Sequence, residues 1–135
     1  LVTVSGSGRV RGAHLDLSLT SELTCVAAGL LALADGPGSI RGVGHVRGHE
    51  TDRLAALEAE LKALGGLVEQ TSDGLAITPA PLHGGTFHTY SDHRMAHAGA
   101  LIGLAVAGVE LDDVSCTTKT LPDFPGLWRQ LLSPL

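Results

Sequence analysis

Three short segments place charged and hydroxyl side chains where loops run into helices. They comprise residues 45–53, which are rich in ionisable groups, residues 90–97, and residues 116–120, which surround Lys119. Backbone N–H groups at the start of a helix favour anions, and an arginine there can make a bidentate contact with a carboxylate or a phosphate. Together the three segments predict one site for a small, highly anionic ligand.

Each charged residue also has an ordinary explanation when it is taken singly. Asp52 and Arg53 could be surface charges in the first turn of a helix, where ion pairs contribute little. Glu22 could interact only with the start of its own helix. The coincidence of three such junctions favours the ligand site.

Two histidine pairs have the four-residue spacing of helical metal ligands, His45 with His49 and His93 with His97. Gly48 places the first pair in a loop, where the two rings need not share a face. We therefore expect no metal site.

The composition narrows the class of protein. The 135 residues carry nine Lys and Arg against 14 Asp and Glu, a net charge of -5, with no basic run, so nucleic acid is excluded as a partner. No apolar run approaches the roughly 18 residues of a membrane span, and the N-terminus lacks a secretory pattern, so we expect a cytoplasmic location. Cys25 and Cys116 suggest buried thiols rather than a disulfide.

Strands and helices must alternate to position these residues. The hydrophobic pattern predicts helices over 22–35, 50–64, 92–107 and 124–132, the third capped by Ser91 or Asp92. It predicts strands over 1–4, 10–17, 39–43, 67–70, 75–78, 86–90 and 109–114, with a hairpin around Ser72-Asp73-Gly74. The order ββαβαβββαβα indicates stacked α/β units, and the similar His-rich starts of the second and third helices suggest an internal repeat.

Longer motifs in the same segments resemble one enzyme family. GHETDRL at 48–54, YSDHRMAHA at 90–98 and TTKTLPDFP at 117–125 stand in the order and at the separations typical of the 5-enolpyruvylshikimate-3-phosphate (EPSP) synthases. The similarity covers essentially all 135 residues and corresponds to the C-terminal part of that family.

The resemblance implies an α/β fold of repeated βαβαββ units, the inside-out barrel of the enolpyruvyl transferases. Residues 1–135 would be a partial C-terminal domain of about two units, with the N-terminal domain absent. The implied reaction, a step of aromatic amino-acid biosynthesis and the target of glyphosate, uses no metal or organic cofactor. It transfers the enolpyruvyl group of phosphoenolpyruvate to the 5-hydroxyl of shikimate 3-phosphate and releases phosphate.

The family's residue roles can be carried over position by position. Arg53, Arg94 and Lys119 match residues that bind phosphoenolpyruvate, and Glu50 matches the carboxylate that moves a proton at the enolpyruvyl methylene.

The shikimate 3-phosphate side departs from the common pattern at three positions. Glu22 stands where relatives commonly have an aspartate that contacts the substrate hydroxyls and acts as base. His45 and His49 stand where relatives often have Asn and Lys near the substrate phosphate.

Two further functions remain open at this point. One is a noncatalytic fragment or anion-binding module, since the isolated chain should be inactive without the N-terminal domain. The other is the related transferase that acts on UDP-N-acetylglucosamine, although DHRMA and TTKTLPDFP favour the shikimate enzyme.

Overall fold

A computed structural model describes residues 1–134, and its first regular element is β1 (His14–Asp16). The prediction of a strand at 1–4, forming a hairpin or a strand pair with 10–17, is wrong. Leu1, Val2 and Val4 are exposed and pair with no strand of the described chain. Alternating apolar residues do not form a strand without a partner and a core to cover.

The first sheet has four strands in the order β1-β2-β4-β3. β2 (Gly38–Arg41) is parallel to β1 and antiparallel to β4 (Leu75–Thr78), and β3 (Leu67–Gln70) completes the predicted hairpin with β4. The hairpin turn requires Gly74, because a Cβ there would lie 1.8 Å from the carbonyl oxygen of Ile40.

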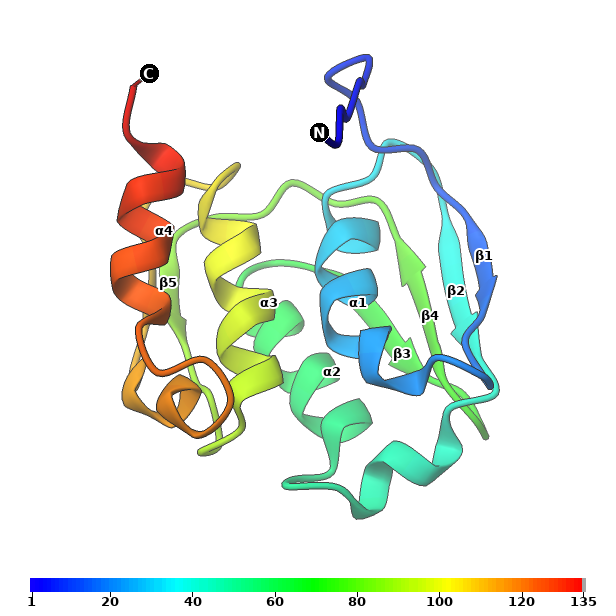
Figure 1. The fold of residues 1–135 in the computed structure, drawn as a ribbon. Helices are drawn as coiled ribbons and strands as arrows, with labels where there is room; N and C mark the ends of the chain where they lie inside the picture. Colours follow the sequence, from blue (N-terminus) through cyan, green and yellow to red (C-terminus); the bar gives the residue numbers. More distant parts are fainter. Residues whose placement is uncertain (135) are drawn as a thin grey trace.

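Four α-helices accompany the strands within residues 1–134 (Figure 1). They are α1 (Thr24–Ala32), α2 (Arg53–Ala63), α3 (His93–Gly103) and α4 (Phe124–Leu132). Short 3₁₀ helices, Ser21–Leu23, Gly44–Gly48 and Ser115–Lys119, stand before α1, α2 and α4. All four predicted helices are present.

Aspartates set the starts of α2, α3 and α4. Asp52, Asp92 and Asp123 accept hydrogen bonds from the backbone N–H groups of Ala55, Arg94 and Gly126, at 3.0, 2.9 and 3.2 Å. The prediction that the second helix begins at residue 50 is therefore wrong, since Asp52 caps it and leaves Glu50 in the preceding loop. The third helix also ends before the predicted residue 107.

The second sheet consists of β5 (Gly85–Phe87) and β6 (Val109–Leu111), which run parallel on either side of α3 in the sequence. Elements β1 to β4 with α1 and α2 form one complete βαβαββ unit, and β5-α3-β6-α4 form the first four elements of a second. The α/β class built of these units is confirmed.

The order of the units corrects the expected repeat. α3 corresponds to α1, and α4 to α2. The similar His-rich starts of α2 and α3 therefore occupy different positions in their units, and their likeness is not the structural repeat.

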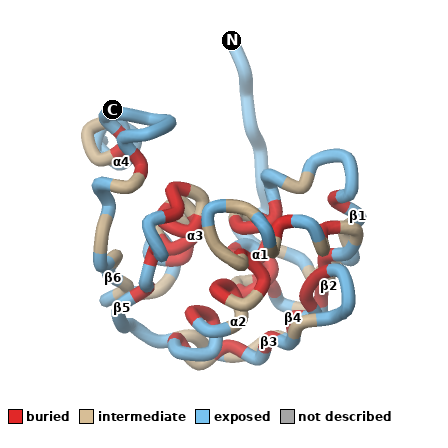
Figure 2. Tube along the Cα trace, turned by 90° about the horizontal axis from the view of Figure 1, so that it is seen from below, coloured by how far each residue is buried: buried red, intermediate tan, exposed pale blue. Residues whose placement is uncertain are grey.

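The core lies between the two sheets. α1 packs on the four-stranded sheet, α3 packs on β6, and the two helices pack on each other (Figure 1). Figure 2 shows the buried residues concentrated along α1, α2 and α3, while the N-terminal segment extends away from them. Within residues 1–134, no helix is long and apolar enough to cross a membrane.

The two cysteines are free thiols, but only Cys25 is buried as predicted. Burial raises the pKa of Cys25 to about 12, so its thiol stays protonated near neutral pH. Cys116 is half-buried and lies within the 3₁₀ turn at Ser115–Lys119.

Candidate functional site

The guanidinium of Arg53 lies at the centre of a polar cluster at the start of α2. Its side chain is 1% exposed, and its Nε and Nη2 donate to the two carboxylate oxygens of Asp92 at 2.7 and 3.2 Å. Nη1 contacts Glu22 Oε2 at 3.2 Å and His49 Nδ1 at 2.9 Å, and Nη2 donates to Glu50 Oε2 at 2.8 Å. These five contacts match the five N–H groups of an arginine.

Asp92 holds two elements together. Its carboxylate is fully buried, binds Arg53 of α2 and caps α3 through the backbone N–H of Arg94. Burial alone would raise the pKa of this carboxyl, but the hydrogen bonds from Arg53 and Arg94 outweigh it and hold the pKa below its usual range. The sequence predicted Asp92 only as a helix cap. It did not predict the contact with Arg53, which lies 39 positions away.

Glu22 lies in the 3₁₀ turn before α1 and contacts three other members of the cluster. Its Oε2 lies 2.5 Å from Arg94 Nε and 3.2 Å from Arg53 Nη1, and its Oε1 lies 3.4 Å from His49 Nδ1. The Arg94 contact is an ion pair without hydrogen-bond geometry. Partial burial raises the pKa of Glu22, but the charges of Arg53 and Arg94 lower it more, so the carboxyl is held below its usual pKa.

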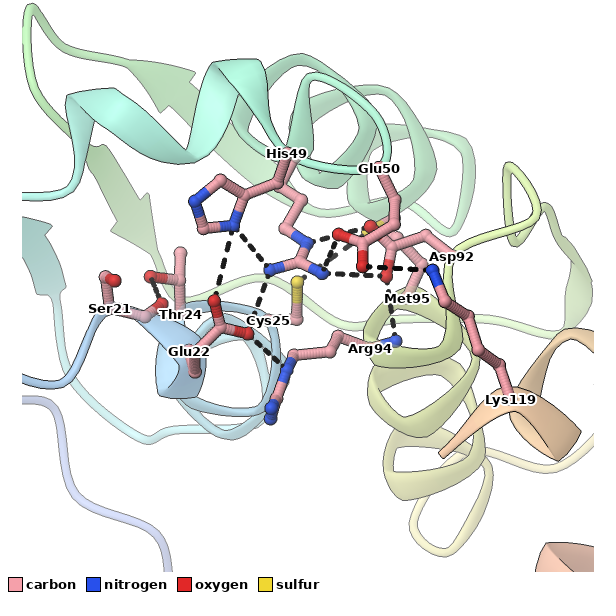
Figure 3. Close-up of polar contacts among 11 residues, drawn as sticks. Ser21, Glu22, Thr24, Cys25, His49, Glu50, Asp92, Arg94, Met95 and Lys119 are labelled. Carbon is pink, nitrogen blue, oxygen red and sulfur yellow. Dashed lines mark hydrogen bonds and ion pairs between the residues drawn. The ribbon is translucent and has the colours of Figure 1, made fainter. Parts of the chain in front are cut away.

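Glu50 connects Arg53 with the third segment. Its Oε2 binds Arg53, and its Oε1 lies 3.9 Å from Nζ of Lys119, at the end of the 3₁₀ turn before α4. The carboxylates of Glu22, Glu50 and Asp92 all face the guanidinium of Arg53, and Figure 3 shows Arg94 reaching the cluster from α3 and Lys119 from the turn before α4. The three predicted segments thus meet at one place.

Six of the seven predicted site residues belong to this network. They are Glu22, His49, Glu50, Arg53, Arg94 and Lys119. The seventh, His45, is exposed and touches the network only through an edge-on contact with the His49 ring, whose centroid lies 5.8 Å away.

The charges of the cluster balance. Three cations, Arg53, Arg94 and Lys119, meet three carboxylates, Glu22, Glu50 and Asp92. A ligand that contacts Arg53 must therefore take over a place that Glu22 or Glu50 now fills. Arg94 is the more open arginine, and Figure 3 shows its terminal nitrogens pointing away from the other residues drawn.

Among residues 1–134, no three His, Cys, Asp or Glu side chains gather as ligands for an ion. The rings of His93 and His97 face each other edge to face, with their centroids 6.1 Å apart.

Comparison with known proteins agrees with the motifs. The family model described as EPSP synthase (3-phosphoshikimate 1-carboxyvinyltransferase) matches residues 2–128. The chain is 58% identical over 130 residues to the 3-phosphoshikimate 1-carboxyvinyltransferase of Kocuria rhizophila, covering 96% of this chain and 29% of that protein. It is 55% identical over 132 residues to the protein of that name from Mycobacterium ulcerans, covering 96% and 30%.

Solved structures of EPSP synthase from Acinetobacter baumannii share the fold. One superposes with a TM-score of 0.83 at 22% identity and another with 0.80 at 20%, each over 90% of this chain and 30% of the solved one. The chain thus spans about 30% of the length of the curated relatives it matches. Because the family model matches nearly every residue, the chain belongs to the EPSP synthase family.

Proposed function

We propose that this chain forms the phosphoenolpyruvate-binding part of an active site that transfers the enolpyruvyl group to the 5-hydroxyl of shikimate 3-phosphate and releases phosphate. The observation that carries this proposal is the convergence of Arg53, Arg94 and Lys119 on Glu22 and Glu50, from three loop-to-helix junctions. The chain spans about 30% of the length of its relatives. We therefore propose the complete reaction only for the chain together with the remaining part of such a protein.

The reaction needs cations and two proton-transfer groups. The shikimate 5-oxygen adds to C2 of phosphoenolpyruvate while a proton is added to the methylene carbon, which gives a tetrahedral intermediate. That intermediate then loses phosphate from C2 and a proton from the new methyl group. Overall, a C2–O bond to the 5-oxygen forms, the C2–O bond to phosphate breaks, and the 5-hydroxyl proton leaves with the phosphate or a base, so the step needs proton-transfer groups and cations but no redox change.

The two glutamates suit the proton transfers. We assign the methylene proton to Glu50, which lies between Arg53 and Lys119 and so faces the cations proposed to hold phosphoenolpyruvate. We assign the hydroxyl proton to Glu22, whose lowered pKa keeps it an ionised acceptor near neutral pH.

The cations differ in how they can reach the ligand. Lys119 is 71% exposed and held by one 3.9 Å contact, and Arg94 is one-third exposed, so both can turn to a phosphate or carboxylate. Arg53 uses all its N–H groups within the protein, and it can contact a ligand only where Glu22 or Glu50 gives up its place.

Substitution of Arg94 tests the proposal directly. Arg94→Lys keeps the charge but removes the bidentate fork, so the dissociation constant for phosphoenolpyruvate, measured by calorimetry, should rise about tenfold. Arg129→Lys, an exposed change on α4, is the matched control and should leave the constant unchanged. Equal affinity of the Arg94 variant and the wild type would remove Arg94 from the site.

A further inference from the structure

Glu60 is a buried carboxylate outside the charged cluster. It lies on α2, is 4% exposed, and accepts three hydrogen bonds from one loop. Its Oε2 accepts from the backbone N–H of His88 at 2.9 Å and contacts His88 Nδ1 at 3.1 Å, and its Oε1 accepts from the Tyr90 hydroxyl at 2.7 Å. Burying a carboxylate is costly unless donors meet it, so this contact fixes the loop to α2.

The loop that Glu60 holds has a disfavoured backbone. Tyr90 and Ser91 have φ values of 55° and 54°, the left-handed region that residues with a Cβ rarely adopt. The turn is also held at Thr89, whose N–H donates to Asp112 Oδ1 at 2.9 Å, and Asp92 N–H donates to the Thr89 carbonyl at 2.8 Å. Such strain persists only where surrounding contacts impose it.

This strained turn leads directly into the site. Asp92 follows it, binds Arg53 and caps the helix on which Arg94 lies. Arg53 and Glu60 are seven residues apart on α2, about two helical turns, so they lie on one face of that helix. α2 therefore binds the segment 88–92 through two residues of one face, Arg53 and Glu60.

We propose that Glu60 is a positioning residue for the anion site, acting through Tyr90 to hold the turn that directs Asp92 and Arg94. The inference rests on the proposed function, because it concerns how Arg94 is presented to phosphoenolpyruvate. The hydrogen bond with Glu60, together with burial, raises the pKa of Tyr90 to about 12, as expected for a hydroxyl donating to an ionised partner.

The first test needs no ligand. The Arg94 backbone N–H is bonded to Asp92, so its hydrogen exchange reports the geometry of the turn. Tyr90→Phe removes one hydroxyl from a residue that is 43% exposed, so the fold should be retained. We expect Arg94 exchange to become about tenfold faster while amides in the middle of α1 keep their rates.

Glu60→Gln should produce the same local effect as Tyr90→Phe. Glu58→Gln is the matched control on the same helix, since Glu58 binds Lys62 and Gln70 and not the 88–92 segment, and it should leave Arg94 exchange unchanged. Unaltered exchange at Arg94 in both Tyr90→Phe and Glu60→Gln overturns the proposal. A uniform rise at Arg94 and in α1 also overturns it, because Glu60 would then serve only general stability.

The second test uses phosphoenolpyruvate itself. With the fold retained, Tyr90→Phe should weaken its binding about fivefold to tenfold, and Glu58→Gln should not. Unchanged affinity in Tyr90→Phe contradicts positioning through Tyr90. If the wild type binds no phosphoenolpyruvate, the proposed function fails, and Arg94 exchange still decides whether Glu60 positions the turn.

Discussion

The contact between Arg53 and Asp92 is the most enclosed interaction of the site. Both side chains are at most 1% exposed, and a buried charge is tolerated only when a partner neutralises it and its hydrogen bonds are made. The sequence identified Arg53 as a cation at a helix start. It could not identify the partner, because Asp92 lies 39 positions away and only the packing of both α2 and α3 on α1 brings the two together.

Removing the charge of Asp92 should strongly destabilise the fold. Asp92→Asn keeps an acceptor for the Arg94 N–H but leaves Arg53 without its bidentate partner, so the free energy of unfolding should fall by about 3–5 kcal/mol. Denaturant unfolding measures this change. Asp16→Asn, which breaks an exposed pair with Arg41, is the control and should leave the stability nearly unchanged. Similar losses in both variants would contradict the buried role of Asp92.

The carboxyls of the cluster also predict a pH dependence. The pKa values of Asp92 and Glu22 are lowered from 3.8 and 4.5, so their contribution to stability is present above those unfolded-state values. It is lost as the pH falls through the folded-state values. Unfolding measured at a series of pH values should show a steep loss below about pH 4 in the wild type and a shallower one in Asp92→Asn. Parallel curves for the two proteins would argue against this origin.

Glu22 contacts both of the arginines that we propose bind phosphoenolpyruvate. Glu22→Gln removes a negative charge beside Arg53 and Arg94, so phosphoenolpyruvate should bind about threefold to fivefold more tightly. In the chain supplemented with the rest of a family protein, the same change should suppress turnover, because the proposed base is lost. Glu69→Gln, an exposed change on β3, controls for net charge in both assays. Weaker phosphoenolpyruvate binding in Glu22→Gln would contradict this expectation.

The close approach of α3 to the second sheet fixes where the helix presents Arg94. Gly99 makes this possible, because a Cβ there would lie 2.5 Å from Leu111 Cδ2 and 2.8 Å from Phe87 Cδ1. Gly99→Ala should lower the free energy of unfolding by about 1–3 kcal/mol through overpacking. Gly103→Ala, at the open end of the same helix, should cause no loss. Equal thermal stability of the two variants would contradict this packing.

Element prediction succeeded where local signals were strong. All four helices contain apolar runs, three of them (α2, α3 and α4) have aspartate caps, and Ser72-Asp73-Gly74 marks the β3–β4 hairpin. It failed where tertiary partners decide. Residues 1–4 alternate between apolar and polar side chains as a strand does, yet they pair with no strand in the described chain. The predicted strand over 86–90 ends at Phe87, because the backbone N–H of His88 donates to Glu60.

At the scale of the whole molecule, the net charge of -5 hides a local concentration of cations. Arg53, Arg94 and Lys119 come from three separate junctions, and the carboxylates around them keep the cluster neutral overall. The sequence motifs identified these members, but the ion pairs that link them depend on the α1, α2 and α3 packing. The chain also spans only about 30% of the length of its relatives. The proposed reaction therefore includes a second substrate-binding surface, supplied by the remaining part of such a protein.

Phosphate release is the measurement that tests the proposed function most directly. The chain is mixed with the remaining segment of a relative, such as the Kocuria rhizophila protein, and given phosphoenolpyruvate with either shikimate 3-phosphate or UDP-N-acetylglucosamine as acceptor. We predict phosphate release only with shikimate 3-phosphate and only when both segments are present, reduced at least about 100-fold by Glu50→Gln. Equal phosphate release by Glu50→Gln and the wild type would contradict the proposed function. So would the absence of phosphate release although both substrates bind.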